Sequence, residues 1–168
     1  PVAITQSWSQ EFNNITLHEI PKRMYIFAKP YVQASRDAPT VADFFARINS
    51  LTINFDNQDG RFSTRDSFDL WKMSVANGLK RSYLAWSKIY GSVCCVDFGK
   101  DLSLNPILCS GVRGNFQLSF KAQFQDIRRE KANDEEANYN YTIHLVTVPE
   151  GVLTIDDQLV SISIGALT

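Results

Sequence analysis

The stretch that decides the fold is residues 116–125, FQLSFKAQFQ. Its apolar residues occupy every even position and its polar residues every odd one. Side chains of a β-strand point alternately to its two faces, so this period of two predicts a strand with one buried and one solvated face. A surface helix would instead repeat its apolar residues every three to four positions. The stretch therefore predicts a half-buried strand of an antiparallel sheet.

Other parts of the chain repeat or extend this signal. The same alternation recurs in two stretches, residues 51–56 (LTINFD) and 139–145 (YNYTIHL). Three further runs are apolar on both faces and are expected to be central strands: residues 24–28 (MYIFA), 93–98 (VCCVDF) and 159–164 (LVSISI). Near the start, the apolar positions change parity around Asn13 and Asn14, which predicts a β-bulge or a bend.

Two segments depart from the β pattern. Thr40 and Asp43 offer side-chain acceptors to the free amides of a first helical turn, which predicts a short helix over residues 44–46 (FFA). Ser63 and Asp66 predict the start of a longer helix.

The longer helix is expected to end near Asn77 and Gly78, because glycine tolerates the left-handed backbone that often closes a helix. Its apolar residues at a spacing of three to four are expected to face the core: Phe68, Trp71, Val75 and Leu79.

Turn residues separate the expected strands at 57–60 (NQDG), 111–114 (GVRG) and 156–157 (DD). Residues 128–136 (RREKANDEE) mix charges without periodicity and are expected to form an exposed loop. The chain shows no βαβ alternation, internal repeat or linker. We therefore predict one all-β domain spanning residues 1–168, an antiparallel β-sandwich with one or two short helices in loops.

Composition excludes several classes of function. The 168 residues include 17 Lys and Arg against 18 Asp and Glu, a net charge of −1, so the whole domain lacks the positive excess for binding nucleic acid or an anionic membrane. No run approaches the roughly 20 apolar residues of a membrane span. The 44% hydrophobic content, with 11 Phe, is sufficient for a packed core.

Residues suited to catalysis or metal binding are few. His18 and His144 are the only histidines, and Cys94 and Cys95 are expected to point to opposite faces of one strand. A zinc site needs three or four ligands at recognisable spacing, and a nucleophile needs a base and an orienting group. We expect no catalytic residue, no metal and no cofactor. The three cysteines, with Cys109 the third, are expected to be reduced thiols.

Five strings, taken in order, carry a resemblance to a known family: PKRMYIFA (21–28), FARINSLTINFDN (45–57), GSVCCVDFGKDL (91–102), GNFQLSFKAQF (114–124) and the terminal residues 150–167. Together they resemble the C-terminal jelly roll of double jelly-roll major capsid proteins of the virophage, Polinton and polinton-like virus type. The resemblance spans residues 20–168. It implies a jelly-roll sandwich with a structural role in the virion and no enzymatic activity.

The resemblance also implies partners. In that family two jelly rolls form a subunit, three subunits form a pseudo-hexagonal capsomer, and capsomers tile an icosahedral shell assembled in the host cell. The expected partners are therefore two further copies, neighbouring capsomers, penton and minor capsid proteins, and the N-terminal jelly roll of the same subunit. Neither a membrane span nor sequence-specific nucleic-acid binding is implied.

The chain departs from the family pattern because it has room for one jelly roll only. With Pro1 and not Met at its start, we expect it to be the C-terminal half of a longer subunit. Three alternatives stay open: a single-roll penton or minor capsid protein, a temporary assembly scaffold, and a carbohydrate-binding jelly roll in which Trp71 and Trp86 stack on a sugar.

Aromatic residues between positions 57 and 86 are candidates for the assembly interface, and Phe62, Tyr83 and Trp86 are expected there as exposed side chains. The alternative is that these aromatics close the end of their own sandwich.

Overall fold

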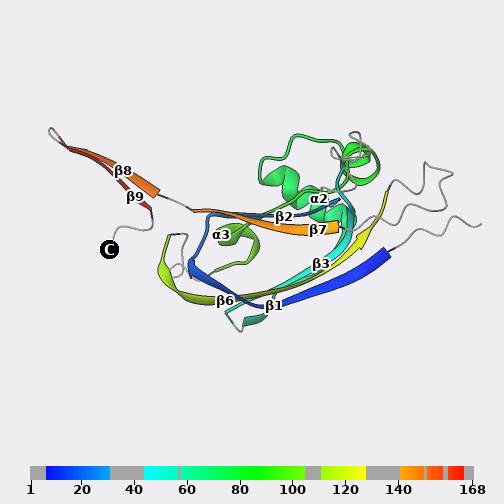
Figure 1. Ribbon diagram of the computed structural model, residues 1–168, viewed down its shortest axis with the longest axis horizontal. Coiled ribbons are helices and arrows are strands. Elements are labelled where there is room, and N and C mark those ends of the chain that lie inside the picture. The colour runs from blue at the N-terminus through cyan, green and yellow to red at the C-terminus, as the bar shows by residue number, and fades with distance from the viewer. Residues whose placement is uncertain are drawn as a thin grey trace, which may run out of the picture.

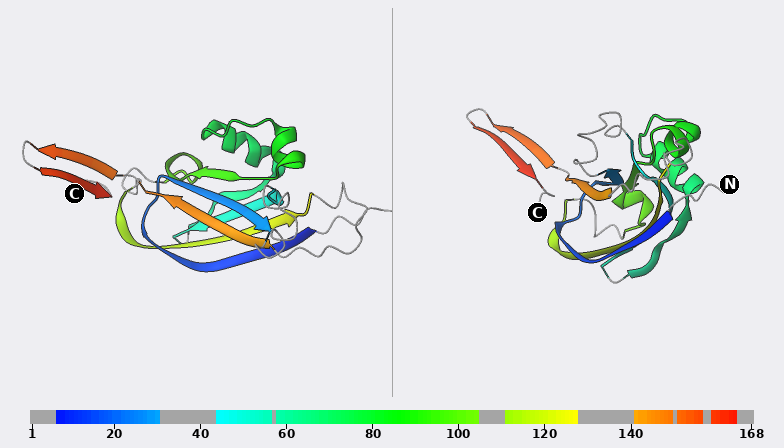
Figure 2. Two further views of the ribbon diagram at one scale, coloured as in Figure 1. Left: turned by 45° about the horizontal axis from the view of Figure 1, so that its top comes forward. Right: turned by 45° about the vertical axis from the view of Figure 1, so that its right-hand side comes forward.

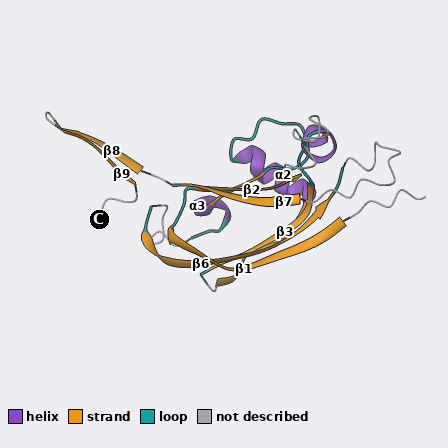
Figure 3. Ribbon diagram, viewed as in Figure 1, coloured by secondary structure: helices purple, strands orange, loops and turns teal. Residues whose placement is uncertain are grey.

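The computed structural model describes residues 7–30, 44–56, 58–104, 111–127, 141–149, 151–156 and 159–164. In these residues the chain forms two facing antiparallel sheets and a separate hairpin (Figure 1, Figure 3). The large sheet consists, in spatial order, of β1 (Ser7–Glu19), β6 (Arg113–Gln125), β3 (Arg47–Phe55) and β4 (Gln58–Asp66). The small sheet consists of β5 (Cys94–Asp97), β2 (Arg23–Pro30) and β7 (Tyr141–Val148). The hairpin pairs β8 (Gly151–Asp156) with β9 (Leu159–Ile164).

The chain changes sheet repeatedly along its length. It passes from β1 in the large sheet to β2 in the small one, returns for β3 and β4, and then visits β5, β6 and β7 in alternation. Sequence neighbours therefore face each other across the core more often than they pair. The predicted antiparallel sandwich is confirmed.

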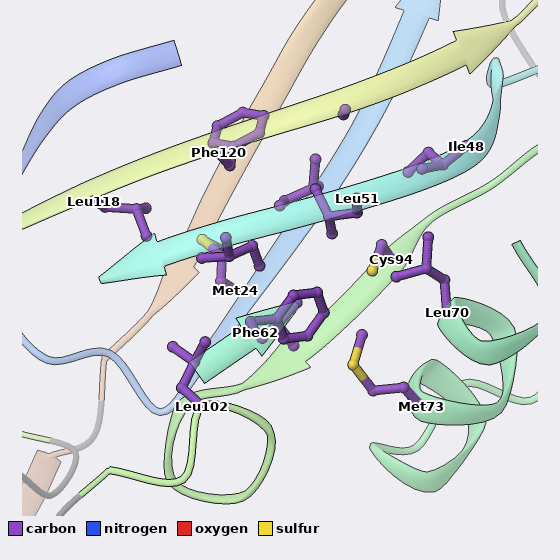
Figure 4. Close-up of a cluster of buried hydrophobic side chains, with 14 of the residues drawn as sticks. Met24, Ile48, Leu51, Phe62, Leu70, Met73, Cys94, Leu102, Leu118 and Phe120 are labelled. Carbon is purple, nitrogen blue, oxygen red and sulfur yellow. The ribbon is translucent and has the colours of Figure 1, made fainter. Parts of the chain in front are cut away.

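The core lies between the two sheets. Along β6 the even-numbered residues from Phe116 to Phe124 are buried, as their alternation with polar residues predicts. Figure 4 shows Phe120 of β6, Leu51 of β3 and Met24 of β2 pointing into one interior. Each such aliphatic or aromatic side chain contributes roughly 1.5–3 kcal/mol when it is fully buried.

Aromatic side chains pack between neighbouring strands and, at Trp8, between the two sheets. Trp8 of β1 stacks on Phe124 with ring centroids 5.6 Å apart and lies 4.9 Å from the ring of Tyr141 in β7. One indole therefore contacts residues of both sheets. Phe12 stacks on Phe120 at 4.8 Å within the large sheet.

The predicted irregularity in the first strand is a β-bulge. β1 remains one strand from Ser7 to Glu19, but its register with β6 shifts between Phe12 and Ile15. Asn14 adopts a positive φ of 60°, a conformation that asparagine tolerates better than most residues. The bulge brings Phe12 and Ile15, which differ in parity, against the same core.

The prediction of central strands is right for one of the three runs. β2 lies in the middle of the small sheet, whereas β5 lies at its edge and β9 pairs with β8 in the hairpin. β5 is apolar on both faces for a different reason. Cys94 faces the core, and Cys95 on the other face is buried with its Sγ 3.9 Å from Asn77 O. A helix lies along the free edge of β5, where the backbone N–H of Cys95 donates to Ser74 Oγ at 3.0 Å.

That helix is α2 (Ser67–Ala76), which begins and ends close to the predicted positions. Asp66 is its N-cap and accepts hydrogen bonds from the backbone N–H groups of Phe68 and Asp69, both at 2.9 Å. Gly78, just beyond the end, has a φ of +106°.

The predicted core-facing side of α2 is wrong for Phe68 and Val75, whereas Trp71 and Leu79 are partly buried against the core. The buried residues of the helix are Ser67, Leu70, Met73 and Ser74, whereas Phe68 and Val75 are exposed. Leu70 and Met73 also satisfy helical spacing, so periodicity alone did not separate the two faces. The position of β5 selects the face that carries Ser74.

The short helix expected at residues 44–46 is not present in the described residues. Residues 44–46 are not helical and lead directly into β3, while Thr40 and Asp43 lie outside the described residues. The backbone N–H of Phe45 donates to Tyr90 O at 2.8 Å, and that of Ala46 donates to Ala28 O at 2.9 Å. These bonds extend the strand in place of a first helical turn. The expected loop at 128–136 also lies outside the described residues.

Two shorter helical segments complete the described chain: η2, a π-helix at Ala85–Ile89, and α3 (Phe98–Asp101). Among the described residues, no helix is long and apolar enough to cross a lipid bilayer.

Candidate functional site

The most distinctive surface of the molecule is a helical lobe, residues 67–90, which comprises α2, η2 and the residues between them. It packs against β5 of the small sheet and against β3 and β4 of the large sheet, and so covers one side of the sandwich (Figure 1, Figure 2). The charge of the lobe comes from Lys72, Lys80, Arg81 and Lys88 against one acid, Asp69. Four positive charges minus one negative charge give +3, in a chain whose net charge is −1.

Buried polar contacts hold α2 on β5. Ser74 Oγ donates to Leu70 O at 2.7 Å within the helix and accepts from the backbone N–H of Cys95. Asn77 Nδ2 donates to Cys95 O at 2.9 Å and to Asp101 Oδ2 at 2.6 Å. Ser74 and Asn77 thereby satisfy the backbone N–H and C=O groups of Cys95, which lie on the free edge of the sheet.

The C-terminal end of the lobe lies close to Phe45, just before β3, and this approach requires Gly91. Its φ of +81° is in the region that favours glycine, and a Cβ at this position would lie only 1.8 Å from Phe45 O. This close approach accompanies the Phe45 to Tyr90 backbone hydrogen bond.

An aromatic cluster fills the lobe. Phe68 stacks on Trp71 with centroids 5.4 Å apart, and both rings meet Tyr83 edge-on, at 5.1 and 5.6 Å. Trp71 Nε1 donates to Arg81 O at 2.9 Å. Two cations lie over outer rings: Lys72 Nζ is 4.4 Å from the ring centre of Phe68, and the Arg81 guanidinium carbon is 4.9 Å from that of Tyr90.

The three predicted interface residues differ in how far they are exposed. Phe62 is 1% exposed and Trp86 is 0% exposed, so neither is the surface side chain that we expected. Trp86 also donates its Nε1–H to Val93 O at 2.9 Å, which satisfies its polar group inside the protein. Both belong to the core of their own sandwich, which favours the alternative for these two residues. Tyr83 is partly buried in the aromatic cluster, with its hydroxyl 3.3 Å from Ser67 Oγ.

The exposed large apolar residues lie beside the predicted ones. Leu84 is 59% exposed, Tyr90 47% and Phe68 43%, and Val75 and Ile89 of the same lobe are also exposed. The other two such residues among the described part of the chain are Val146 and Val148 of β7, in the small sheet. The exposure of Leu84 and Tyr90 was not predicted, because these residues belong to no periodic pattern in the sequence.

The outer face of the small sheet also carries stacked rings. Phe27 of β2 lies opposite His144 of β7, with ring centroids 5.0 Å apart and planes at 17°, and Phe27 meets Phe45 edge-on at 5.3 Å. His144, expected on the polar side of its strand, is therefore packed against an aromatic ring.

The cysteines of β5 are free thiols in a protected environment. Burial raises the pKa of Cys94 to about 12. Burial also raises the pKa of Cys95 above its usual value. Both stay protonated at neutral pH, which makes them poor nucleophiles and poor metal ligands. Cys109 lies outside the described residues.

In the part of the chain that the structure describes, no group of three or more His, Cys, Asp or Glu side chains is placed to hold a metal ion. The sugar-stacking pair Trp71 and Trp86 does not form a platform, because the indole of Trp86 is fully buried.

Comparison with known proteins gives the family. The family model for the major capsid protein V20 C-terminal domain matches residues 2–151. The chain belongs to this family. It is thus a major capsid protein domain of the virophage type, and its place is in the virion capsid. The resemblance that the five sequence strings carried is confirmed.

Relatives of this capsid domain agree in sequence and in fold. The putative capsid protein V20 of Sputnik virophage is 25% identical over 174 residues, which cover 91% of this chain and 28% of that protein. A chain in the cryo-EM structure of the Sputnik virophage superposes with a TM-score of 0.82 at 23% identity, covering 99% of this chain and 36% of the other. The crystal structure of the mavirus major capsid protein gives a TM-score of 0.77 at 14% identity, covering 98% and 36%.

These likenesses confirm the predicted jelly-roll β-sandwich. The capsid domain spans between about a quarter and two fifths of the length of these relatives.

Proposed function

We propose that this capsid domain is the C-terminal jelly roll of a double jelly-roll subunit, and that three subunits associate into a pseudo-hexagonal capsomer of an icosahedral shell. The observation that carries the proposal is the family match across residues 2–151, supported by a fold shared with a chain of the Sputnik virophage structure. The N-terminal roll of the same subunit, neighbouring capsomers, and penton and minor capsid proteins are the proposed partners. The activity is assembly, without catalysis.

The distribution of polarity supports an assembly role. The exposed large apolar residues among those described lie on the helical lobe and on β7 of the small sheet. An obligate interface buries more than about 2,000 Å² and is more apolar than ordinary surface. We therefore place the subunit contacts on the lobe, within the predicted segment 57–86 and its continuation to Tyr90. Phe68, Leu84 and Tyr90 are its exposed apolar residues, in place of the buried Phe62 and Trp86.

The test is to purify particles, count the copies of this chain by quantitative mass spectrometry, and image the particles by cryo-EM. We expect the chain to be a dominant component of the shell, in threefold capsomers. Absence of the chain from mature particles would contradict the proposal and would favour a temporary scaffold. Density for the chain only at the fivefold vertices would favour a penton protein.

A further inference from the structure

Exposed apolar side chains lie at two opposite sides of the sandwich. The small sheet has β5 at one edge and β7 at the other, with β2 between them. The helical lobe is hydrogen-bonded to β5 and therefore lies at the β5 side. Trp8 of β1 contacts Tyr141, so β1 and β7 lie together at the other side. Of the exposed large apolar residues in the described chain, five belong to the lobe and two, Val146 and Val148, to β7.

The apolar residues at the β7 side belong to the outer face of the small sheet. The residues of β2 alternate between half-buried and buried, and the half-buried Tyr25 lies opposite Val146. Opposite residues of an antiparallel pair share a face, so Tyr25, Val146 and Val148 form one patch, the β7 patch. Arg23, opposite Val148, has its Nε 3.9 Å from Asp97 Oδ2. A sheet face left in water is ordinarily polar, so the β7 patch fits a covering partner.

The lobe and the β7 patch differ in chemistry. The lobe has a charge of +3, so two lobes that face each other repel. The β7 patch consists of aliphatic and aromatic side chains. Different surfaces at opposite sides of one domain are suited to the heterologous contacts of a ring, in which each member touches two neighbours.

The symmetry of the proposed capsomer decides which neighbours these are. The domain covers 36% of a chain in the Sputnik virophage structure, so most of that relative's chain lies outside it. Three subunits of two jelly rolls each place six rolls in a ring, and a threefold rotation moves every roll by two positions. C-terminal rolls therefore occupy every second position, and each has an N-terminal roll on either side.

We infer that the lobe and the β7 patch each bind an N-terminal jelly roll, one from the same subunit and one from the next. This arrangement rests on the proposed function and deepens it, because it assigns a partner to each of the two surfaces. The polar outer face of the large sheet is left to solvent.

Crosslinking of purified particles tests the partners. Three sides of the domain carry lysines that can report on their neighbours. Lys80 and Lys88 are exposed on the lobe, Lys29 lies opposite Thr142 of β7, and Lys121 is exposed on the outer face of the large sheet. Particles assembled from isotopically labelled and unlabelled subunits are treated with an amine-reactive crosslinker, and the linked peptides are identified by mass spectrometry. We expect the lobe lysines and Lys29 to link to peptides of the N-terminal roll at least about tenfold more often than Lys121 does, because a polar sheet face stays in solvent.

Variants test whether the two surfaces are needed. Leu84→Asp in the lobe and Val146→Asp in the β7 patch place a carboxylate in each contact. We expect each change to lower the yield of capsomers at least about tenfold, because an unpaired charge resists burial. Gln123→Asp, on the exposed outer face of the large sheet, is the matched control and is expected to keep the yield within about twofold of the wild type. Circular dichroism melting checks that each variant is folded.

Links from both surfaces to the N-terminal roll, together with loss of capsomers in the two patch variants alone, support the arrangement. Mixed-isotope links that join the lobe or Lys29 of one copy to this same domain of a second copy overturn it. Equal capsomer yields from the three variants overturn it as well. In either case, cryo-EM images that show the chain in threefold capsomers leave the proposed function standing.

Discussion

The two sheets of the sandwich present opposite chemistry to the outside. The outer face of the large sheet is covered by small polar side chains that bond to each other: Thr52 Oγ1 lies 2.8 Å from Thr64 Oγ1, and Asn49 Nδ2 donates to Gln125 Oε1 at 3.1 Å. The small sheet instead exposes Val146 and Val148 of β7, and the adjoining lobe, which packs on strands of both sheets, exposes Leu84 and has a charge of +3. A polar sheet face is stable in water, whereas exposed apolar surface of this kind usually marks an interaction site. One face of the sandwich is therefore suited to solvent and the other to a partner.

The largest expected effect comes from the residue that anchors the lobe. Trp86→Ala removes a fully buried indole and leaves Val93 O without its donor, so we expect the free energy of unfolding to fall by about 3–5 kcal/mol. Urea denaturation followed by circular dichroism measures the change. Leu84→Ala, two residues away and largely exposed, is the matched control and is expected to cost less than about 0.5 kcal/mol. Similar losses in both variants would contradict the division of the lobe into a buried and an exposed side.

The attachment of the lobe to the start of β3 gives the next effect. Gly91→Ala forces a Cβ toward Phe45 O in a backbone conformation that favours glycine, and we expect a loss of about 2–3 kcal/mol in the free energy of unfolding. Gly99→Ala, in α3 and without a positive φ, is the control and is expected to be neutral within about 0.5 kcal/mol. A thermally neutral Gly91→Ala variant would mean that the lobe is not held at this point.

The pH dependence of stability tests the burial of β5 beneath α2. Burial raises the pKa of Cys94 to about 12 in the folded chain from an ordinary value of 9.0, so between these values the folded state keeps a proton that the unfolded state loses. The stabilisation is complete below pH 9 and declines as the pH rises. From pH 9 to 10.5 we expect the wild type to lose about 1–2 kcal/mol more than Cys94→Ala, which has no thiol to titrate. Parallel pH profiles for the two proteins would show that Cys94 is accessible to water.

The smallest effect is expected on the solvated face of the large sheet. Thr52→Val removes an exposed cross-strand hydroxyl pair and is expected to change the free energy of unfolding by less than about 1 kcal/mol, with self-association unaffected. Val146→Thr, the reverse change on β7, is expected to be equally mild for folding but to weaken association. Sedimentation velocity and urea denaturation of both variants sharpen the contrast, and equal effects on association would remove it.

Much of the fold followed from local patterns. The alternation in β6 predicted its buried face residue by residue, and the parity change at Asn13 and Asn14 predicted the bulge in β1. These predictions succeeded because a strand that forms one wall of a core has only two faces, and each residue must take one of them.

The assembly interface stays a prediction, but the expected exposure of Phe62 and Trp86 is wrong, because both are buried. Phe62 and Trp86 are large and apolar, and nothing in their local sequence distinguishes them from Tyr90. Burial of Trp86 depends on the carbonyl of Val93 and on the path of the chain through Gly91, which are tertiary features.

Local sequence patterns were enough to predict most of the strands, the bulge, the ends of α2 and the family, because each of these depends on residues close together in the chain or on their order. They missed β4 (Gln58–Asp66), since residues 57–60 were predicted as a turn and Ser63 as part of a helix start. Tertiary packing determines that Leu70 and Met73 face inward while Phe68 and Val75 face outward, and that β5 lies at an edge alongside α2. The physical reason is that burial depends on what lies opposite a residue, and the partner of α2 is a strand about twenty residues further along the chain.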